Sequence, residues 1–335
     1  MNKEELRLAA VIDRFRGKKI AVWGDFILDE YLIGTTRRIS REAPVLIISY
    51  RNKESTPGGA GNSLLNIKAL GADPIPIGVV GRDEAGDQIL EILRGRCIST
   101  RFLVRDPSYP TPIKTRILAG EENTRKQQIL RIDKEGRVPE TASLKRRIQS
   151  MLVRAKDFCS ALLISDYHYM TVQEDIFAAV LPHYRKARIP VTLDSRFRFL
   201  SFKHVTVATP NEPEVEAAFH QEMGGRADLL KEAGKSLLRK LGSSALLITR
   251  GSRGMALFEK GKPPVLIPIR GPADIVDVTG AGDTVISVFT LGLAAGASFR
   301  DAATLANAAG GIVVMKKGTA TVSPEELRKA VVSSP

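Results

Sequence analysis

Short apolar runs that end at a polar residue alternate with helical patterns through the second half of the chain. The runs, each given with the polar residue that ends or follows it, are 161–165 with Asp166, 190–193 with Asp194, 205–208 with Asn211 and 245–249 with Thr249. Helical patterns occupy 143–154, 173–185 and 228–241. This alternation predicts a parallel sheet covered by helices on both faces.

The polar strand ends predict where a ligand binds. The carboxyl ends of parallel strands meet at one edge of a sheet, and in open α/β sheets ligands bind outside that edge. The first apolar run, 19–23, ends in Gly24-Asp25, and Asp29 follows. We expect Asp25 and Asp29 to grip hydroxyl groups there; for Asp25, turn formation is the alternative.

Two segments stand outside the alternation. Residues near 31–56 and 102–133 carry extended patterns, the clearest at 112–118 and 127–132. We expect them to form a small separate sheet, a lid whose Arg and Lys side chains close over an anionic substrate. The whole chain, 1–335, then forms a single domain.

The stretch 277–284 combines two glycines with two aspartates ahead of a helical pattern at 285–295. We expect a strand, a glycine-rich turn and a helix, which presents free backbone N–H groups to an anion. Gly280 and Gly282 let the main chain approach that anion. Asp283 lies in the first helical turn and can act as a base toward a hydroxyl, so the stretch suits phosphoryl transfer. The alternative is a tight turn with Asp283 as helix N-cap.

Net charge narrows the choice of partners. The formal charge of +13 favours anionic partners, whether phosphorylated metabolites, nucleic acid or a membrane surface. The basic residues form short scattered groups without a basic, aromatic-interleaved motif, so nucleic-acid binding is not expected. The amino terminus lacks a signal-peptide apolar region, and the most apolar run, 284–299, is too short for a membrane span. We expect a soluble, cytoplasmic protein without a membrane partner.

Four motifs occur in the order typical of the ribokinase-like (PfkB) carbohydrate kinases, which the chain resembles over nearly its whole length. The motifs are Gly58-Gly59-Ala60-Gly61-Asn62, Gly78-x-x-Gly81-x-Asp83-x-x-Gly86, Asn211-x-x-Glu214 and 277–283. The resemblance implies a three-layer α/β sandwich with a mostly parallel central sheet and a β-sheet lid. It also implies an enzyme that transfers phosphate from ATP to a sugar hydroxyl with Mg²⁺, and a homodimer formed through the lid.

Within that family the chain looks most like the kinases of D-glycero-D-manno-heptose 7-phosphate. The matching stretches are 24–29, 38–45, 114–116, 127–133, 305–310 and 318–323. The implied reaction is phosphorylation of the anomeric hydroxyl to the 1,7-bisphosphate, on the route to ADP-heptose. Bifunctional members carry a nucleotidyltransferase domain after the kinase, and because this chain stops at Pro335, we expect the kinase alone.

Two departures from the heptose-kinase pattern bear on the substrate rather than on kinase activity. After Asp166-Tyr167 those kinases usually continue Gly-Lys-Gly, where this chain has His168-Tyr169-Met170. Their Asp-Pro-Lys is Asp194-Ser195-Arg196 here, which keeps a cation and changes its shape.

The resemblance also implies a role for each site residue. Asp283 is the base, and the backbone of Gly280, Ala281 and Gly282 holds the transferred phosphate. The expected sugar-binding residues are Asp25, Asp29, Gly58, Gly59 and Asn62, with Arg116, Arg131 and Arg196 as candidates for phosphate contacts. The expected nucleotide-binding residues are Arg196, Asn211, Thr249, Gly251, Gly254 and Asn307. Glu214 and Asn211 are expected to support magnesium, partly through water.

Two alternatives to a heptose-phosphate kinase stay open. One is another sugar or nucleoside kinase of the same family. The other, more remote, is a sugar-responsive binding protein that keeps the fold without turnover. The presence of both Asp283 and the Asn211-x-x-Glu214 motif favours an enzyme. A nicotinamide enzyme is not expected, because no dinucleotide-binding fingerprint follows the first strand.

Overall fold

A large, mostly parallel sheet forms the centre of the molecule in the computed structural model, which describes residues 2–121, 126–269 and 276–332. Its nine strands lie in the order β13-β12-β11-β10-β9-β8-β1-β4-β5. The strands are β1 (Lys19–Gly24), β4 (Asp73–Gly81), β5 (Leu103–Asp106), β8 (Ala161–Asp166), β9 (Val191–Ser195), β10 (Val207–Ala208), β11 (Ala245–Thr249), β12 (Met255–Glu259) and β13 (Val265–Ile267). Neighbouring strands run parallel from β5 to β11, and β12 and β13 continue antiparallel.

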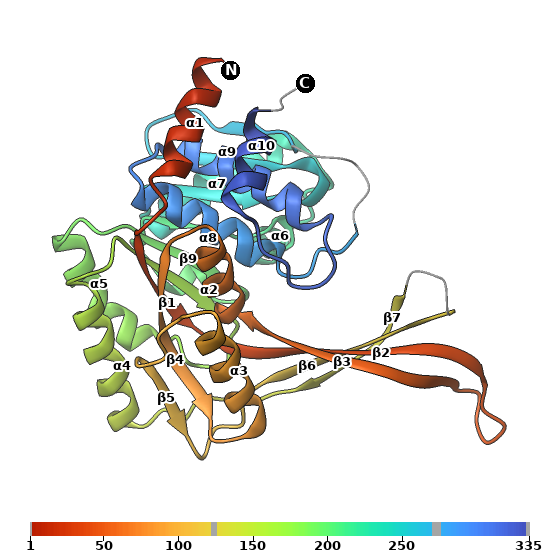
Figure 1. Cartoon of the computed structure of the whole chain (residues 1–335). Helices are drawn as coiled ribbons and strands as arrows, with labels where there is room; N and C mark the ends of the chain where they lie inside the picture. The colour runs from red at the N-terminus through yellow and green to blue at the C-terminus, as the bar shows by residue number, and fades with distance from the viewer. Residues whose placement is uncertain (1, 122–125, 270–275, 333–335) are drawn as a thin grey trace.

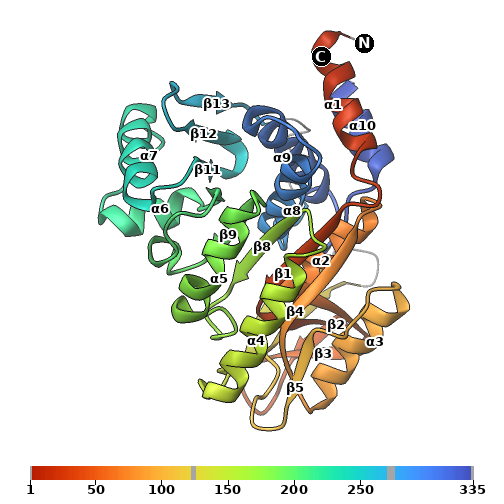
Figure 2. The ribbon, with the colours of Figure 1, turned by 90° about the vertical axis from the view of Figure 1, so that its left-hand side faces the viewer.

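Helices cover both faces of this sheet, as the alternation predicted (Figure 2). They are α1 (Lys3–Asp13), α2 (Ala60–Ala69), α3 (Glu84–Gly95), α4 (Ala142–Ala155), α5 (Glu174–Lys186), α6 (Glu212–Phe219), α7 (Ala227–Leu241), α8 (Ala281–Ala294), α9 (Phe299–Val313) and α10 (Pro324–Val332), with short 3₁₀ turns η1 (Phe199–Ser201) and η2 (Gly251–Arg253). Alternate side chains of β1 enter different cores, because successive residues of a strand point to opposite faces. Ile20 and Val22 join the core with α2, α8 and α9, whereas Ala21 and Trp23 join the core with α4 and α5. The three-layer sandwich is therefore confirmed.

A second, four-stranded sheet projects from the body as an arm, which we call the lid (Figure 1). Its strands are β2 (Phe26–Ile39), β3 (Leu46–Gly59), β6 (Ile113–Gly120) and β7 (Gln127–Lys134), in the order β3-β2-β6-β7. The outer pairs are antiparallel, and β2 with β6 is parallel. One part of the predicted lid segment 102–133 lies elsewhere, because β5 pairs with β4 and extends the large sheet.

The strand predicted to end at Val276, ahead of the glycine-rich turn, lies outside the described residues except for its last position. Within the described residues, 276–280 contain no strand; instead the N–H groups of Val276 and Asp277 both donate to the carbonyl of Val314, at the end of α9. The helix begins at Ala281, which places Asp283 in the first turn as expected, four residues before the apolar pattern starts at Val285. Apolar periodicity starts only at Val285, because the first turn is occupied by the polar site residues.

Among the helices of the described residues, none combines the length and the apolar character needed to cross a bilayer.

Candidate active site

Most of the predicted site residues line one cavity of about 480 Å³ at the carboxyl ends of the central strands, beneath the base of the lid. Those that line it are Asp29, Gly59, Arg116, Arg131, Arg196, Asn211, Glu214, Thr249, Gly280, Gly282 and Asp283. The cavity therefore gathers residues from β2, β6, β9, β11, α6 and α8, which are far apart in the sequence.

Asp283 is an enclosed carboxylate that faces the cavity, with 2% of its surface exposed. The Asn62 side chain donates from Nδ2 to Asp283 Oδ2 at 3.0 Å, and the Tyr167 hydroxyl donates to Oδ1 at 3.0 Å. Burial, with a smaller contribution from the charge of Asp194, raises the pKa of Asp283 to about 7, against the lowering effect of these two hydrogen bonds. A carboxylate with that pKa can exchange a proton near neutral pH.

The N-terminus of α8 faces the same cavity. Gly280 is the N-cap with φ of 75°, and a side chain there would collide with the Asn62 amide that binds Asp283. The N–H of Ala281 donates to the Val278 carbonyl at 3.2 Å, so it is already engaged, unlike the expectation. Within the described residues the N–H groups of Gly282 and Asp283 have no protein acceptor. The anion donors are therefore these two groups at the helix N-terminus.

Asn211 and Glu214 serve first as a helix cap. The Asn211 side chain accepts from the Glu214 N–H at 2.8 Å, and Glu214 Oε2 accepts from the Asn211 N–H at 2.9 Å, which forms the capping box of α6. Both residues also line the cavity. Burial raises the pKa of Glu214 to about 7, and it lies near Asp194, whose pKa burial and Glu214 raise to about 8.

The side of the cavity that holds Asp194 and Glu214 fits a magnesium ion whose remaining ligands are water and substrate. Two partly enclosed carboxylates, Asp194 and Glu214, face the cavity with raised pKa values, which a divalent cation would lower. Across the described residues, however, no group of three or more His, Cys, Asp or Glu side chains is gathered closely enough to hold a metal. The residues therefore suit Mg²⁺ bound through few carboxylates, water and substrate phosphates.

The cations of the cavity differ in whether they already have a partner. Arg116 Nη1 contacts Asp29 Oδ1 at 2.6 Å in a buried ion pair, and Arg131 binds Asp133 through two hydrogen bonds of 2.8 and 2.9 Å. Lys114, only 7% exposed, makes no ion pair or side-chain hydrogen bond within the described residues. Burial, followed by the nearby charge of Arg196, lowers the pKa of Lys114.

Lys114 and Tyr167 are site residues that the sequence reasoning missed. Lys114 precedes Arg116 by two positions on β6, and residues two apart on a strand share a face. Because Arg116 was named as a phosphate contact, Lys114 could have been named as well, since it lies on the same face of the same strand. Tyr167 follows Asp166 directly at a polar strand end, which is the position that flagged Asp166 itself.

Asp25 does not line the cavity, contrary to its expected role as a sugar ligand. It is fully buried, and its carboxylate accepts backbone hydrogen bonds from Tyr167 at 2.8 Å, Tyr169 at 3.1 Å and Thr171 at 3.0 Å. Burial and then the charge of Asp166 raise the pKa of Asp25 to about 6. The turn-forming alternative describes this residue better.

Several other predicted residues lie outside the cavity lining. Asn62 reaches the site through its hydrogen bond to Asp283, and Gly58 lies against the Asp29 carboxylate. Gly251 is the first residue of the turn η2 after Thr249, and Gly254 directly follows that turn. The Asn307 amide donates to the Pro268 carbonyl at 2.7 Å, because α9 supports the chain after β13 there. None of the last three lines the cavity.

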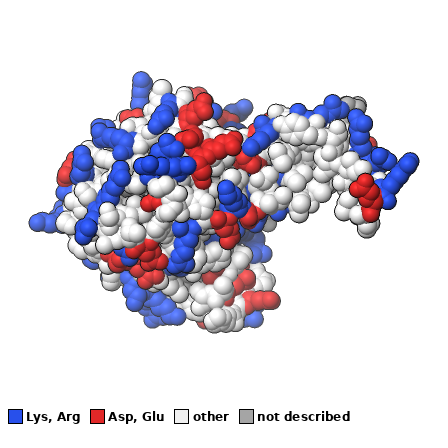
Figure 3. Space-filling view, turned by 90° about the horizontal axis from the view of Figure 1, so that it is seen from below, with Lys and Arg blue, Asp and Glu red and all other residues white. Residues whose placement is uncertain are grey.

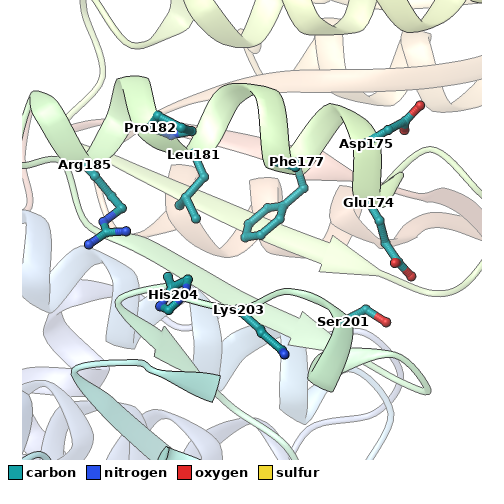
Figure 4. Close-up of a pocket in the computed structure, with 10 residues that line it drawn as sticks. Glu174, Asp175, Phe177, Leu181, Pro182, Arg185, Ser201, Lys203 and His204 are labelled. Atoms are coloured by element: carbon teal, nitrogen blue, oxygen red, sulfur yellow. The ribbon is translucent and has the colours of Figure 1, made fainter. Parts of the chain in front are cut away.

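A larger hollow of about 810 Å³ lies between α5 and the segment 201–204, away from these residues (Figure 4). Phe177 and Leu181 extend from α5 toward Lys203 and His204 on the opposite side. No predicted site residue lines this hollow. It lacks the buried carboxylates of the first cavity, because its two acidic residues, Glu174 and Asp175, are exposed.

The chain is similar to curated proteins along most of its length. It is 41% identical over 307 residues to the bifunctional protein HldE of Geobacter sulfurreducens, covering 91% of this chain and 61% of that protein. It is 37% identical over 325 residues to the bifunctional protein HldE of Pelobacter propionicus, covering 97% and 65%. The chain thus spans less than two thirds of the length of these relatives.

The fold is similar to that of a solved sugar kinase. The ribokinase of Arabidopsis thaliana, determined with ribose and ATP, aligns with a TM-score of 0.71 at 22% identity, covering 95% of this chain and all of that one. The ribokinase-like fold predicted from the sequence is confirmed. The sequence pattern of the pfkB family matches residues 18–326, so the chain belongs to the pfkB family of carbohydrate kinases.

Proposed function

We propose that this chain transfers a phosphoryl group from ATP to the anomeric hydroxyl of D-glycero-D-manno-heptose 7-phosphate, giving the 1,7-bisphosphate. The observation that carries the proposal is the placement of Asp283 beside the open N–H groups of α8, in a cavity that also contains the unpaired cation Lys114. The heptose assignment draws on the sequence stretches shared with heptose kinases and on the similarity to bifunctional HldE proteins.

In the proposed reaction Asp283 accepts the proton of the sugar hydroxyl. Its pKa of about 7 leaves a substantial ionised fraction at neutral pH while keeping it basic enough to take a proton. The N–H groups of Gly282 and Asp283 hold the transferred phosphoryl group, where the helix dipole favours negative charge. Positioning and electrostatic stabilisation of this kind account for most of phosphoryl-transfer catalysis.

Magnesium and ATP bind on the side of the cavity formed by α6 and β11. Glu214 and Asn211 support the metal, and Thr249 lies near the nucleotide. Held there, a metal would supply positive charge that offsets the charge of the phosphates. Because capping uses Glu214 Oε2, its Oε1 is the oxygen left for the metal or its water.

The sugar's own phosphate binds to Lys114 and Arg196. Arg116 already neutralises Asp29 and Arg131 already binds Asp133, so neither is as available as the sequence suggested. Arg196 makes no ion pair within the described residues and lines the cavity. Asp29 remains placed to accept from a sugar hydroxyl, with Arg116 fixing its orientation.

We also propose a homodimer formed through the lid, and a cytoplasmic location, where ATP and sugar phosphates occur together. Charged side chains on the face seen in Figure 3 are scattered over the body, whereas the middle of the arm is largely uncharged. That distribution favours a protein partner for the arm over a polyanion for the body.

An ATP-consumption screen tests the function. Phosphorylated heptoses, hexoses, pentoses and nucleosides are compared, with Asp283→Asn as the control. We expect heptose 7-phosphate to give the highest kcat/KM, and Asp283→Asn to lower kcat roughly 10²–10⁴-fold with ATP affinity nearly unchanged. A different preferred acceptor favours another sugar or nucleoside kinase. No turnover on any acceptor favours the binding-protein alternative, and near wild-type turnover by the variant removes Asp283 as the base.

A further inference from the structure

Two hydrogen bonds from different elements fix the carboxylate of Asp283. Asn62 on α2 binds Oδ2, and Tyr167, directly after β8, binds Oδ1, each at 3.0 Å. Donors on both oxygens determine the plane of the carboxylate as well as its position. The Asn62 position belongs to a family motif, whereas the role of Tyr167 emerges only from the structure.

The Tyr167 hydroxyl is the donor in this pair. Burial, and then the charge of Asp283, hold the pKa of Tyr167 well above its ordinary value, so the phenol keeps its proton. An ionised carboxylate can only accept, so the O–H must point at Asp283 Oδ1. A hydrogen bond donated to the charged form of an acid favours that form.

The loop that carries Tyr167 is held in a conformation that side chains seldom adopt. His168 and Met170 have φ of 70° and 71°, in the left-handed region. The buried Asp25 carboxylate compensates by accepting three backbone hydrogen bonds from this loop, the first from Tyr167 itself. Strain that is kept in place by a buried carboxylate suggests that the placement of the loop matters.

The ring of Tyr167 is confined as well. Lys114 Nζ lies 5.0 Å from its centroid and Arg196 Cζ lies 5.9 Å away. On another side Gly59, with φ of 57°, leaves only enough room for the ring, since a Cβ there would lie 3.3 Å from Tyr167 Cδ2. The hydroxyl therefore has little freedom to leave Asp283.

We infer that Tyr167 is a positioning residue for Asp283, whose hydroxyl aims the carboxylate at the acceptor and stabilises its ionised form. The inference rests on the proposed function for Asp283. Other charged groups act on Asp283 too: Asp194 at the end of β9 and Asp29 on β2 oppose its ionisation. The cations Lys114 and Arg196 face the ring of Tyr167.

The test compares Tyr167→Phe with Tyr169→Phe, the same change two residues away on a side chain that makes no contact with Asp283. The pH dependence of kcat/KM is measured with heptose 7-phosphate and MgATP. Loss of the donor should move the acidic limb of Tyr167→Phe upward by roughly one pH unit, whereas Tyr169→Phe should match the wild type. A wild-type acidic limb in Tyr167→Phe would overturn the inference.

A second measurement does not need turnover. ¹³C-carboxyl NMR follows the ionisation of Asp283, assigned by its loss in Asp283→Asn, and should show the same upward shift in Tyr167→Phe. This titration separates failure of the inference from failure of the proposed function. If Tyr167→Phe does not fold, 3-fluorotyrosine at position 167 keeps the packing and donates more strongly. It should move the Asp283 titration to lower pH, and an unmoved titration would contradict the inference.

Discussion

At the scale of single residues, a basic side chain is a good candidate for binding phosphate only if it does not already have a carboxylate partner. Arg116 and Arg131 were identified from the sequence as phosphate contacts, yet both have carboxylate partners in the folded chain. Lys114 has no carboxylate partner within the described residues, and only 7% of its surface is exposed. An enclosed ammonium without an anion is costly, so it suits a site that an anionic substrate completes.

Lys114→Met tests this residue, because Met keeps the length of the stem and removes the charge. We expect KM for heptose 7-phosphate to rise roughly ten- to hundredfold, while free heptose is affected much less, since charge-assisted hydrogen bonds contribute about 1.5–3 kcal/mol. The matched control is Arg131→Met, where the exposed guanidinium is already bound by Asp133 and a smaller change is expected. Equal effects on the phosphorylated and the free sugar would count against the assignment.

At the scale of secondary-structure elements, one motif performs two tasks. The side chains of Asn211 and Glu214 close the N-terminus of α6 and also face the cavity. The capping box therefore fixes the Glu214 carboxylate at the wall of the cavity, where we propose that it supports magnesium.

Glu214→Gln separates the two tasks, since Gln can also complete a capping box. We expect the free energy of unfolding to change by less than about 1 kcal/mol, while the magnesium concentration needed for half-maximal rate rises. Thermal unfolding and magnesium titrations of the initial rate measure these separately. An unchanged magnesium titration would exclude Glu214 as a metal ligand.

The lid exposes apolar side chains that its own sheet does not cover. Leu130 and Ile132 on β7 are each 53% exposed. We expect the wild type to sediment as a dimer, and the double variant Leu130→Asp, Ile132→Asp to sediment as a monomer. The control is Leu6→Asp on α1, which removes an equally exposed apolar side chain far from the lid. A monomeric wild type at micromolar concentration would contradict the proposed dimer.

Apolar periodicity predicted most of the helices and strands. Local sequence patterns could not predict the places where contacts with distant residues determine the structure. β11 matches its predicted bounds, and α4, α5 and α7 lie within a residue of theirs, because apolar spacing directly reflects burial. Apolar spacing could not show that the backbone N–H groups of Val276 and Asp277 donate to the carbonyl of Val314, the C-cap residue of α9. The burial of Asp25 could not be predicted either, because three backbone donors from the loop after β8 occupy its carboxylate.

At the scale of the whole molecule, the buried base should reduce stability at neutral pH. The pKa of Asp283 is raised to about 7 in the fold, against about 3.9 for a free Asp. Its contribution to stability is therefore present at low pH and is lost as the pH rises through about 7. Asp283→Asn removes this dependence while keeping the shape.

We therefore expect Asp283→Asn to gain stability relative to the wild type as the pH rises from about 4 to about 7, by at most about 1.4 kcal/mol per pH unit, with a constant difference above that range. Urea unfolding of both proteins across that range gives the difference directly. Taking the difference cancels the effect of the +13 net charge, which changes little between the two proteins. A difference that does not vary with pH would contradict a raised pKa for Asp283.

We propose that this chain phosphorylates the anomeric hydroxyl of a sugar that already carries a phosphate. The most direct measurement is ³¹P NMR of a reaction containing heptose 7-phosphate, ATP and Mg²⁺. We expect a new phosphate resonance coupled to the anomeric proton, appearing together with ADP, and at least tenfold slower formation of product from free heptose at low sugar concentration. No new anomeric phosphate, or a preference for free heptose, would show that the chain does not catalyse this reaction.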